Sequence, residues 1–159
     1  MPSRMPMDLA ALLLRLVGGL IFLPHGWSKV AGEGGAGTFA ASMSTEYGIP
    51  LFLGHLAAWA EVAGAALLIV GLLTRLDAIL LAATMFVAVF VVSLPDAMFE
   101  IPPGSIKLFV ALRGIELPLA MLAISLALVL LGGGRFSLDY ALRGLLPKKK
   151  AAAEAAAVT

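Results

Sequence analysis

Four long apolar segments constrain this chain more than any other feature of its sequence. They lie at about residues 8–27, 51–73, 78–94 and 106–131. A helix of about 20 residues rises about 30 Å, which matches the hydrocarbon core of a bilayer. Hydrophobic residues make up 61% of the 159 residues, against about 45–50% in soluble domains. The sequence therefore predicts an all-α fold, a four-transmembrane-helix bundle.

The segments between and after these spans complete the predicted organisation. Residues 30–50 form a long glycine-rich loop, residues 74–77 a tight turn, and residues 95–105 a polar connection. Ser137 can cap a short interfacial helix that carries Leu138, Leu142 and Leu145 on one side. We expect residues 1–147 to form one domain. Residues 148–159 are basic and then alanine-rich, and we expect them to be disordered.

Lysine and arginine are distributed unequally about the predicted membrane. One side has arginines at 4, 75, 135 and 143 and three lysines at 148–150, whereas the other has only Lys29 and Lys107. Because positive residues mark the cytoplasmic side, both termini are expected in the cytoplasm. The chain is then a multi-pass protein of the bacterial cytoplasmic (inner) membrane, with the lipid bilayer as its first partner.

Composition also excludes several classes of function. The chain has no cysteine, which rules out a dithiol redox centre, a thiolate metal site and disulfides. Its formal net charge is only +1, so charge balance gives no indication of a nucleic-acid partner.

Charged residues inside the spans are the strongest functional signal. Glu61 lies at the centre of the second span, Arg15 in the first, and Arg113 and Glu116 in the last. An ionisable group at this depth should face protein or water rather than lipid. Depths within about 5 Å of the midplane predict that Arg15 pairs with Glu61, Glu116 or both. Such a cluster either fixes helix order alone, or lets Glu61 or Glu116 handle a proton or a polar ligand head.

Helical spacing predicts which faces pack together. Small residues recur with Glu61 on the second span, so Glu61 should point into the bundle. The proposed packing faces are Ala11, Arg15, Gly18, Phe22, His25 and Lys29 on the first span, Ala57, Glu61, Gly64 and Gly71 on the second, and Arg113, Glu116, Ala120, Ala123 and Ala127 on the last.

Two histidines sit at matching depth near the predicted outer face. His25 ends the first span, and His55 lies one turn inside the second. They could hydrogen-bond a quinone carbonyl, ligate a metal or haem, or be ordinary interfacial polar groups. No spacing motif supports a metal site, so none is assigned. Trp59 lies deeper than an interfacial anchor should, and we expect it to line a cavity beside His55.

Several motifs taken together resemble the DoxX family. They are LLRL at 13–16, FLPHG at 22–26, EVAG at 61–64, GLLTR at 71–75, ELPL at 116–119 and GGRFSLD at 133–139. The resemblance covers about residues 9–143. The family consists of small four-helix membrane proteins, and one branch supplies the membrane subunit of a thiosulfate:quinone oxidoreductase. Another member joins a membrane complex with a superoxide dismutase and a sulfurtransferase.

The resemblance implies a quinone-linked subunit that works with a redox partner protein. A quinone ring would lie near His25, Trp59 and His55. Glu61 or Glu116 would act catalytically on protons, and Arg15 and Lys29 would contribute to binding. Arg113 is a further candidate binding residue, as a charged residue of the last span rather than through the resemblance. The alternatives are a non-catalytic scaffold that recruits redox or stress-response proteins, and a small transporter whose pore needs a homo-oligomer.

Overall fold

A computed structural model describes residues 5–99 and 106–145. The predicted basic and alanine-rich tail at 148–159 lies outside these residues. The described elements are all helical: α1 (Met5–Ala31), α2 (Gly35–Tyr47), α3 (Leu51–Val70), α4 (Thr74–Val87), η1 (Ala88–Ser93), α5 (Leu94–Phe99), α6 (Lys107–Leu131) and α7 (Leu138–Leu145). The all-α prediction is confirmed.

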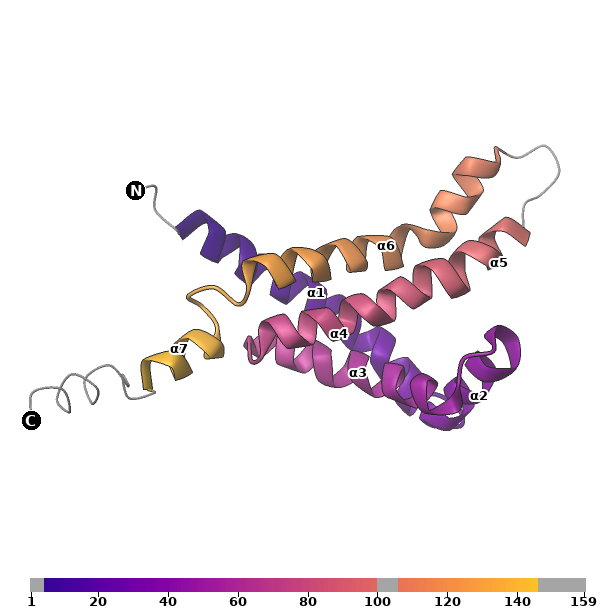
Figure 1. Cartoon of the computed structure of the whole chain (residues 1–159), viewed down its shortest axis with the longest axis horizontal. Coiled ribbons are helices and arrows are strands. Elements are labelled where there is room, and N and C mark those ends of the chain that lie inside the picture. The colour runs from indigo at the N-terminus through magenta and orange to yellow at the C-terminus, as the bar shows by residue number, and fades with distance from the viewer. Residues whose placement is uncertain (1–4, 100–105, 146–159) are drawn as a thin grey trace, which may run out of the picture.

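Four helical stretches are long and apolar enough to cross a membrane. They are Met5–Ala31, Leu51–Val70, Thr74–Phe99 and Leu112–Leu131. The third consists of α4, η1 and α5 joined end to end, and these long helices run along the same axis of the molecule (Figure 1). The predicted four spans are therefore confirmed, although the first and third are longer than expected.

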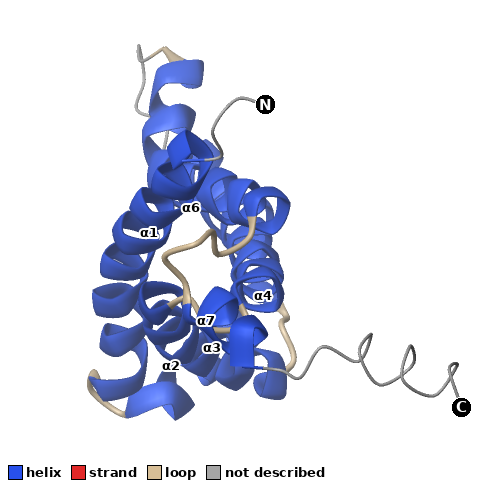
Figure 2. Cartoon of the chain, turned by 90° about the vertical axis from the view of Figure 1, so that its left-hand side faces the viewer, coloured by secondary structure: helices blue, strands red, loops and turns tan. Residues whose placement is uncertain are grey.

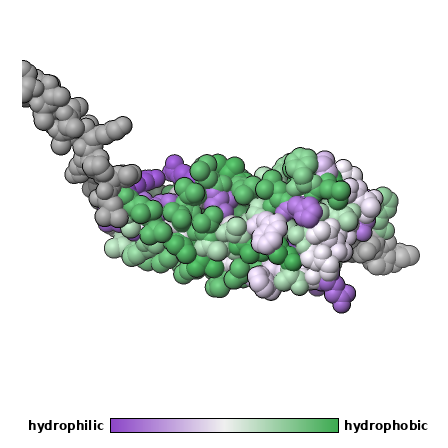
Figure 3. Space-filling model, turned by 90° about the horizontal axis from the view of Figure 1, so that it is seen from below, coloured by the Kyte–Doolittle hydropathy of each residue, from purple (hydrophilic) through white to green (hydrophobic). Residues whose placement is uncertain are grey.

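The interior is built mainly from aliphatic side chains and small residues. Phe22, Leu68, Leu81, Met121 and Leu128 are buried together where α1, α3, α4 and α6 meet. The outer face is also apolar, and hydrophobic side chains cover most of the face in Figure 3. Many other leucines, phenylalanines and valines along the spans are more than one third exposed. A soluble protein rarely leaves so large an apolar area uncovered, so this surface suits contact with lipid.

The predicted loop at 30–50 contains a helix, α2, which is a correction to the sequence analysis. Gly34 and Gly48 flank α2, and both adopt left-handed backbone conformations that stop the adjoining helices. The helix packs against α3 where Gly54 faces Ala40. A Cβ added at Gly54 would lie 2.7 Å from the Ala40 Cα, so the two backbones approach closely.

A hydrogen bond also attaches α2 to the third span. The Tyr47 hydroxyl donates to Oδ2 of Asp96 in α5 at 2.6 Å. This bond to an acceptor carboxylate raises the pKa of Tyr47 to about 12. The α2 segment is therefore held at both of its ends, by the short connection to α1 and by this bond.

The turn between α3 and α4 lies at residues 71–73, so the predicted tight turn at 74–77 is wrong. Helix α4 already begins at Thr74 because an acidic side chain caps it from a distance in sequence. The carboxylate of Asp139 accepts hydrogen bonds from the amides of Leu73, at 2.7 Å, and Thr74, at 2.9 Å. These amides belong to the unsatisfied donors of a helix N-terminus.

The predicted short helix near the C-terminus is present as α7. Its first-turn amide on Tyr140 donates to the Ser137 hydroxyl at 3.2 Å, which confirms Ser137 as its cap. The Asp139 amide donates to the Gly71 carbonyl at 3.0 Å. Asp139 therefore joins α7 to the α3–α4 turn through its backbone and its side chain.

We expect stability to decline in acid through Asp139. Partial burial opposes ionisation, but hydrogen bonds from the Thr74 and Leu73 amides outweigh it and lower the pKa of this carboxyl. A lowered folded pKa stabilises the protein above the unfolded value of about 3.9, and that contribution is lost as the pH falls further. Thermal unfolding in detergent between pH 3 and pH 7, followed by circular dichroism, measures the loss.

The matched variants for this prediction are Asp139→Asn and Glu33→Gln. An asparagine side chain cannot ionise, so the unfolding temperature of Asp139→Asn should vary less with pH below about 4. Glu33 is exposed in the α1–α2 turn, so its substitution should preserve the wild-type pH profile. An unchanged acid profile in Asp139→Asn contradicts the capping role.

Candidate functional site

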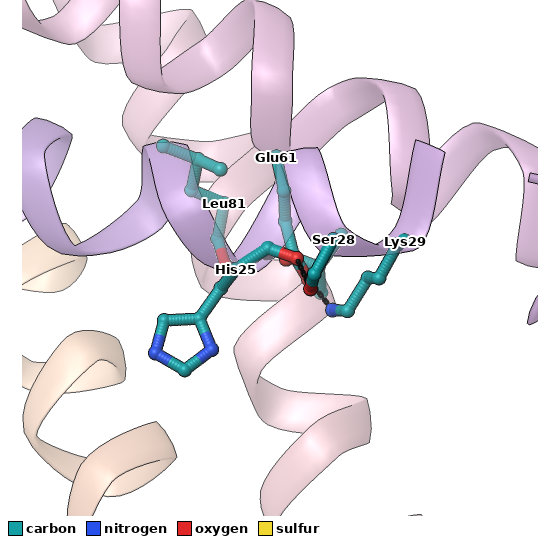
Figure 4. A network of polar contacts seen from close by, with 6 residues as sticks. His25, Ser28, Lys29, Glu61 and Leu81 are labelled. Atoms are coloured by element: carbon teal, nitrogen blue, oxygen red, sulfur yellow. Dashed lines mark hydrogen bonds and ion pairs between the residues drawn. The ribbon is translucent and has the colours of Figure 1, made fainter. Parts of the chain in front are cut away.

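The central acid of the second span forms an ion pair inside the bundle. Glu61 is 2% exposed, and its Oε1 lies 2.5 Å from Nζ of Lys29 on α1. Figure 4 shows the two side chains reaching toward each other. Glu61 faces the interior as predicted, but its partner is Lys29, a residue that the sequence analysis had not paired with it.

A glycine on α1 permits this contact. A Cβ added at Gly26 would lie 2.7 Å from the Val62 amide nitrogen and 2.9 Å from the Glu61 Cβ. The two helices therefore cross with their backbones almost touching. Helix α1 continues through Pro24 to Ala31, so Lys29 follows Gly26 by about one turn and extends along α3 to the Glu61 carboxylate.

The ion pair borders an apolar pocket of about 520 Å³. Four elements supply its walls: Phe39 and Met43 from α2, Leu53 and Leu56 from α3, Leu80 from α4, and Val91 from η1. Thr84 also lines it, but its hydroxyl donates to the Leu81 carbonyl at 2.9 Å. Lys29 and Glu61 are thus the only charged residues among the described residues that line this pocket.

One oxygen of the buried carboxylate lacks a partner. Lys29 donates to Oε1 of Glu61, whereas Oε2 has no hydrogen bond to any residue that the structure describes. An unsatisfied buried acceptor costs about 1–3 kcal/mol, and more when it is charged. This oxygen can therefore be stabilised by a proton, or by a hydrogen bond from a water molecule or from a donor group on a ligand.

The wall formed by η1 is an unusual piece of backbone. Residues Ala88–Ser93 are π-helical within an otherwise α-helical span. A π-helical turn inserts an extra residue and is often found where a helix contributes to a functional site. Here it contributes Ala88, Val91 and Val92 to the pocket.

Arg15 does not join this cluster, so the predicted pairing with Glu61 or Glu116 is wrong. Its guanidinium donates to four backbone carbonyls, those of Leu68 at 2.9 Å, Ile69 at 3.0 Å, Gly133 at 2.7 Å and Phe136 at 3.3 Å. The first two carbonyls end α3, where they have no helical partners and carry the negative end of the helix dipole. Arg15 is 1% exposed and acts as a structural clamp between α1, α3 and the α6–α7 loop.

Gly71 makes room for this clamp. Its φ of +76° ends α3 in a left-handed conformation, and an added Cβ would lie 2.4 Å from the guanidinium carbon of Arg15. Only glycine satisfies both demands at this position.

The predicted packing face of α6 is also corrected. Arg113, Glu116, Ala120 and Ala123 are exposed, whereas Met121, Ser125 and Leu128 are the residues buried against the bundle. The inner stripe of α6 therefore runs along a different side of the helix. Arg113 and Glu116 lie toward the start of α6, where that helix visibly bends away from its remaining length (Figure 1). They reach neither Glu61 nor Arg15.

The two histidines and Trp59 lie outside the pocket. His25 and His55 are exposed, and the His25 imidazole points away from the ion pair (Figure 4). Trp59 is 55% exposed and does not line the cavity, so the prediction that it lies in the wall beside His55 is wrong. Within residues 5–99 and 106–145, no group of three or more His, Cys, Asp or Glu side chains is arranged to hold a metal.

The contribution of α2 to the pocket was not predicted. Phe39 and Met43 are four residues apart and therefore share one helical face. This spacing was the available signal, but the glycines around it indicated a loop. Lys29 was included as a binding residue, and the structure places it at the pocket.

These features define a small helical membrane protein with four spans and a buried ion pair beside an apolar pocket. The DoxX family model matches residues 10–94, and the chain belongs to the DoxX family. The matched part contains both members of the ion pair and every pocket-lining residue. The motifs at 116–119 and 133–139 lie beyond it.

A curated relative is named "Putative oxidoreductase CatD", from Bacillus subtilis (strain 168). It is 37% identical over 87 residues, which are 55% of this chain and 62% of the relative. The matched segment thus spans less than two thirds of that relative. No solved structure matches this chain.

Proposed function

We propose that this chain is a quinone-binding membrane subunit of a redox system, with the quinone head in the pocket beside Lys29 and Glu61. The observation that carries the proposal is the unpartnered Oε2 of buried Glu61 at the wall of an apolar cavity. Ligand pockets typically combine an apolar lining with a few convergent polar groups. A volume of about 520 Å³ is within their usual range of about 300–1,000 Å³.

The residues present fit the chemistry of a quinone. A quinone supplies carbonyl acceptors that take up electrons and protons together. The ammonium of Lys29 can donate a hydrogen bond to such a carbonyl, while Oε2 of Glu61 can accept one from the hydroxyl of the reduced quinol and take up its proton. The apolar walls suit a ring and the first part of an isoprenoid tail, and they limit the access of water to the ion pair.

A partner protein is the proposed electron source. The chain has no cysteine to provide a dithiol, and the matched relative is named as an oxidoreductase.

We also propose a bacterial cytoplasmic membrane location with both termini inside. Arg75, Arg135 and Arg143 gather at the α7 end, whereas Lys29 lies toward the α2 end. That asymmetry follows the positive-inside rule.

We expect quinone to co-purify with the wild-type protein. Organic extraction of detergent-purified protein, followed by mass spectrometry, measures the amount per chain. Glu61→Gln removes a charge-assisted hydrogen bond of about 1.5–3 kcal/mol, so quinone retention should fall about 10–100-fold. Glu116→Gln is the matched control because this residue is exposed and does not line the pocket.

A second variant tests the pocket without altering the ion pair. Ala57 lines the cavity, and Ala57→Phe fills part of its volume. Loss of quinone from folded Ala57→Phe protein supports the assigned location. Equal quinone in Ala57→Phe, Glu61→Gln and wild type, or none in wild type, contradicts the proposal. In the latter case the scaffold alternative gains support.

A further inference from the structure

A second cavity lies at the opposite end of the bundle, and nothing in the quinone proposal uses it. Its volume is about 570 Å³. The beginning of α1, the α3–α4 turn, the end of α6 and helix α7 supply its walls. Figure 2 looks onto this end and shows the α6–α7 loop crossing between the helices. The lining is polar, in contrast to the apolar pocket at the α2 end.

Three arginines and two aspartates line this cavity. They are Arg75, Arg135, Arg143, Asp8 and Asp139. Both aspartates already have partners. Asp139 caps α4 through the amides at 73 and 74, and Asp8 accepts from the Arg135 amide at 3.1 Å while its Oδ2 lies 3.6 Å from the Arg135 Nε.

Two of the arginines retain hydrogen-bonding capacity, although the charge of Arg143 also helps to lower the pKa of Asp139. Arg75 donates one long hydrogen bond, of 3.3 Å, to the Leu130 carbonyl. Neither Arg75 nor Arg143 forms an ion pair with another residue in the described part of the chain. Both are exposed to the cavity region, so it has an excess of positive charge. Two guanidinium groups around a concavity suit a phosphate, which accepts their parallel N–H donors.

The loop after α6 shapes this side of the cavity. A Cβ added at Gly132 would lie 3.1 Å from the Arg75 Nε. The Arg75 side chain therefore lies along the loop and is held near the cavity. A bulkier residue at position 132 would have to displace it.

The other residues that line the cavity indicate which kind of molecule would carry the phosphate. Leu73 and Leu76 also line the cavity, and they are 54% and 65% exposed. The cavity lies where the spans end, so these leucines continue the lipid-facing surface. A ligand here can place a charged head against the arginines and a hydrocarbon chain against the leucines.

We propose that this cavity binds the phosphate of an anionic phospholipid headgroup, with Arg75 and Arg143 as its main contacts. A basic pocket between helices at the membrane surface is a known arrangement for such lipids. A soluble phosphate shares the same chemistry, so the experiment must separate the two sources.

The test is lipid retention in nanodiscs and detergent, read by native mass spectrometry. The full chain is placed in bilayers of phosphatidylglycerol or of phosphatidylcholine. Wild type should keep phosphatidylglycerol preferentially after release into detergent. Each arginine near an anionic surface contributes about fivefold, so Arg75→Gln/Arg143→Gln should reduce retention about 25-fold. Arg113→Gln is the matched control, an exposed arginine at the far end of α6.

The remaining outcomes each overturn the proposal or its lipid assignment. Equal retention by the double variant and wild type, or equal retention of the two lipids, overturns it. A second arm adds millimolar inorganic phosphate to protein in phosphatidylglycerol nanodiscs. If inorganic phosphate binds there and displaces phosphatidylglycerol, the assignment of the ligand to a lipid headgroup is contradicted. The basic tail is unchanged in every variant, so retention by the tail alone would also leave the double variant like wild type.

Discussion

Replacing Arg15 with leucine is expected to lower the free energy of unfolding by more than about 3 kcal/mol. The guanidinium satisfies four carbonyl oxygens, and it is almost completely buried. Each buried acceptor left without a partner costs about 1–3 kcal/mol. Detergent-solubilised protein titrated with a denaturing detergent, followed by circular dichroism, measures the change.

Arg15→Lys separates charge from geometry in the same assay. A lysine keeps the positive charge but has one compact donor head in place of the planar fork. It cannot reach both the α3 end and the α6–α7 loop as Arg15 does, so Arg15→Lys should recover only part of the lost stability. Full recovery by lysine contradicts the clamp and implies that the charge alone matters.

The second large effect is expected for Lys29→Met. This substitution leaves Glu61 buried without a cation, and breaking a buried pair in this way typically costs about 3–5 kcal/mol. Lys29→Met/Glu61→Leu removes both charges and fills the space with apolar atoms. The double variant should therefore regain most of the stability that the single variant loses.

The same double variant distinguishes a structural ion pair from a functional one. If the pair serves the ligand, the stable Lys29→Met/Glu61→Leu protein should no longer retain quinone. If the pair only holds α1 against α3, quinone retention should follow stability and return with it. A double variant as unstable as Lys29→Met alone contradicts the coupling between these two residues.

The membrane spans and the burial of Glu61 could be predicted because both follow from one physical constraint. Lipid offers no hydrogen bonds and does not solvate charge, so long apolar segments become helices and an acid within them turns inward. A buried acid turns inward whichever residue is its partner. The burial of Glu61 was therefore predicted correctly even though its predicted partner was wrong.

The partners of Arg15 could not be found in the same way. Its acceptors are backbone carbonyls, which every residue has, and they become available only because α3 ends at Gly71. Matching charges by depth overlooked this possibility. It also overlooked Lys29. This residue lies at a different depth in the membrane from Glu61, but its long side chain reaches the Glu61 carboxylate.

The pocket could not be predicted because it depends on tertiary structure that the local sequence does not determine. The segment of α2 is rich in glycine and small polar residues, which favour loops in isolation. Contact with α3 at Gly54 and the bond from Tyr47 to Asp96 hold it as a helix.

The prediction that Trp59 lies in the interior was wrong for a related reason. The small residues Gly54, Ala58 and Ala60 and the acid Glu61 occupy the packed side of α3, and Trp59 points elsewhere.

The Arg15 clamp has a consequence for biogenesis. Helix α1 is synthesised first, but the acceptors of Arg15 lie at positions 68, 69, 133 and 136. An arginine in a membrane helix costs about 2.5–3.5 kcal/mol on insertion at the helix centre, and less toward the helix ends, where Arg15 finds its acceptors. Part of that cost can be offset once α3 has emerged, and the rest only when the fourth span has emerged and the α6–α7 loop has closed over α1. Nascent chains that stall before Gly133 therefore have only the Leu68 and Ile69 carbonyls as partners for this buried cation.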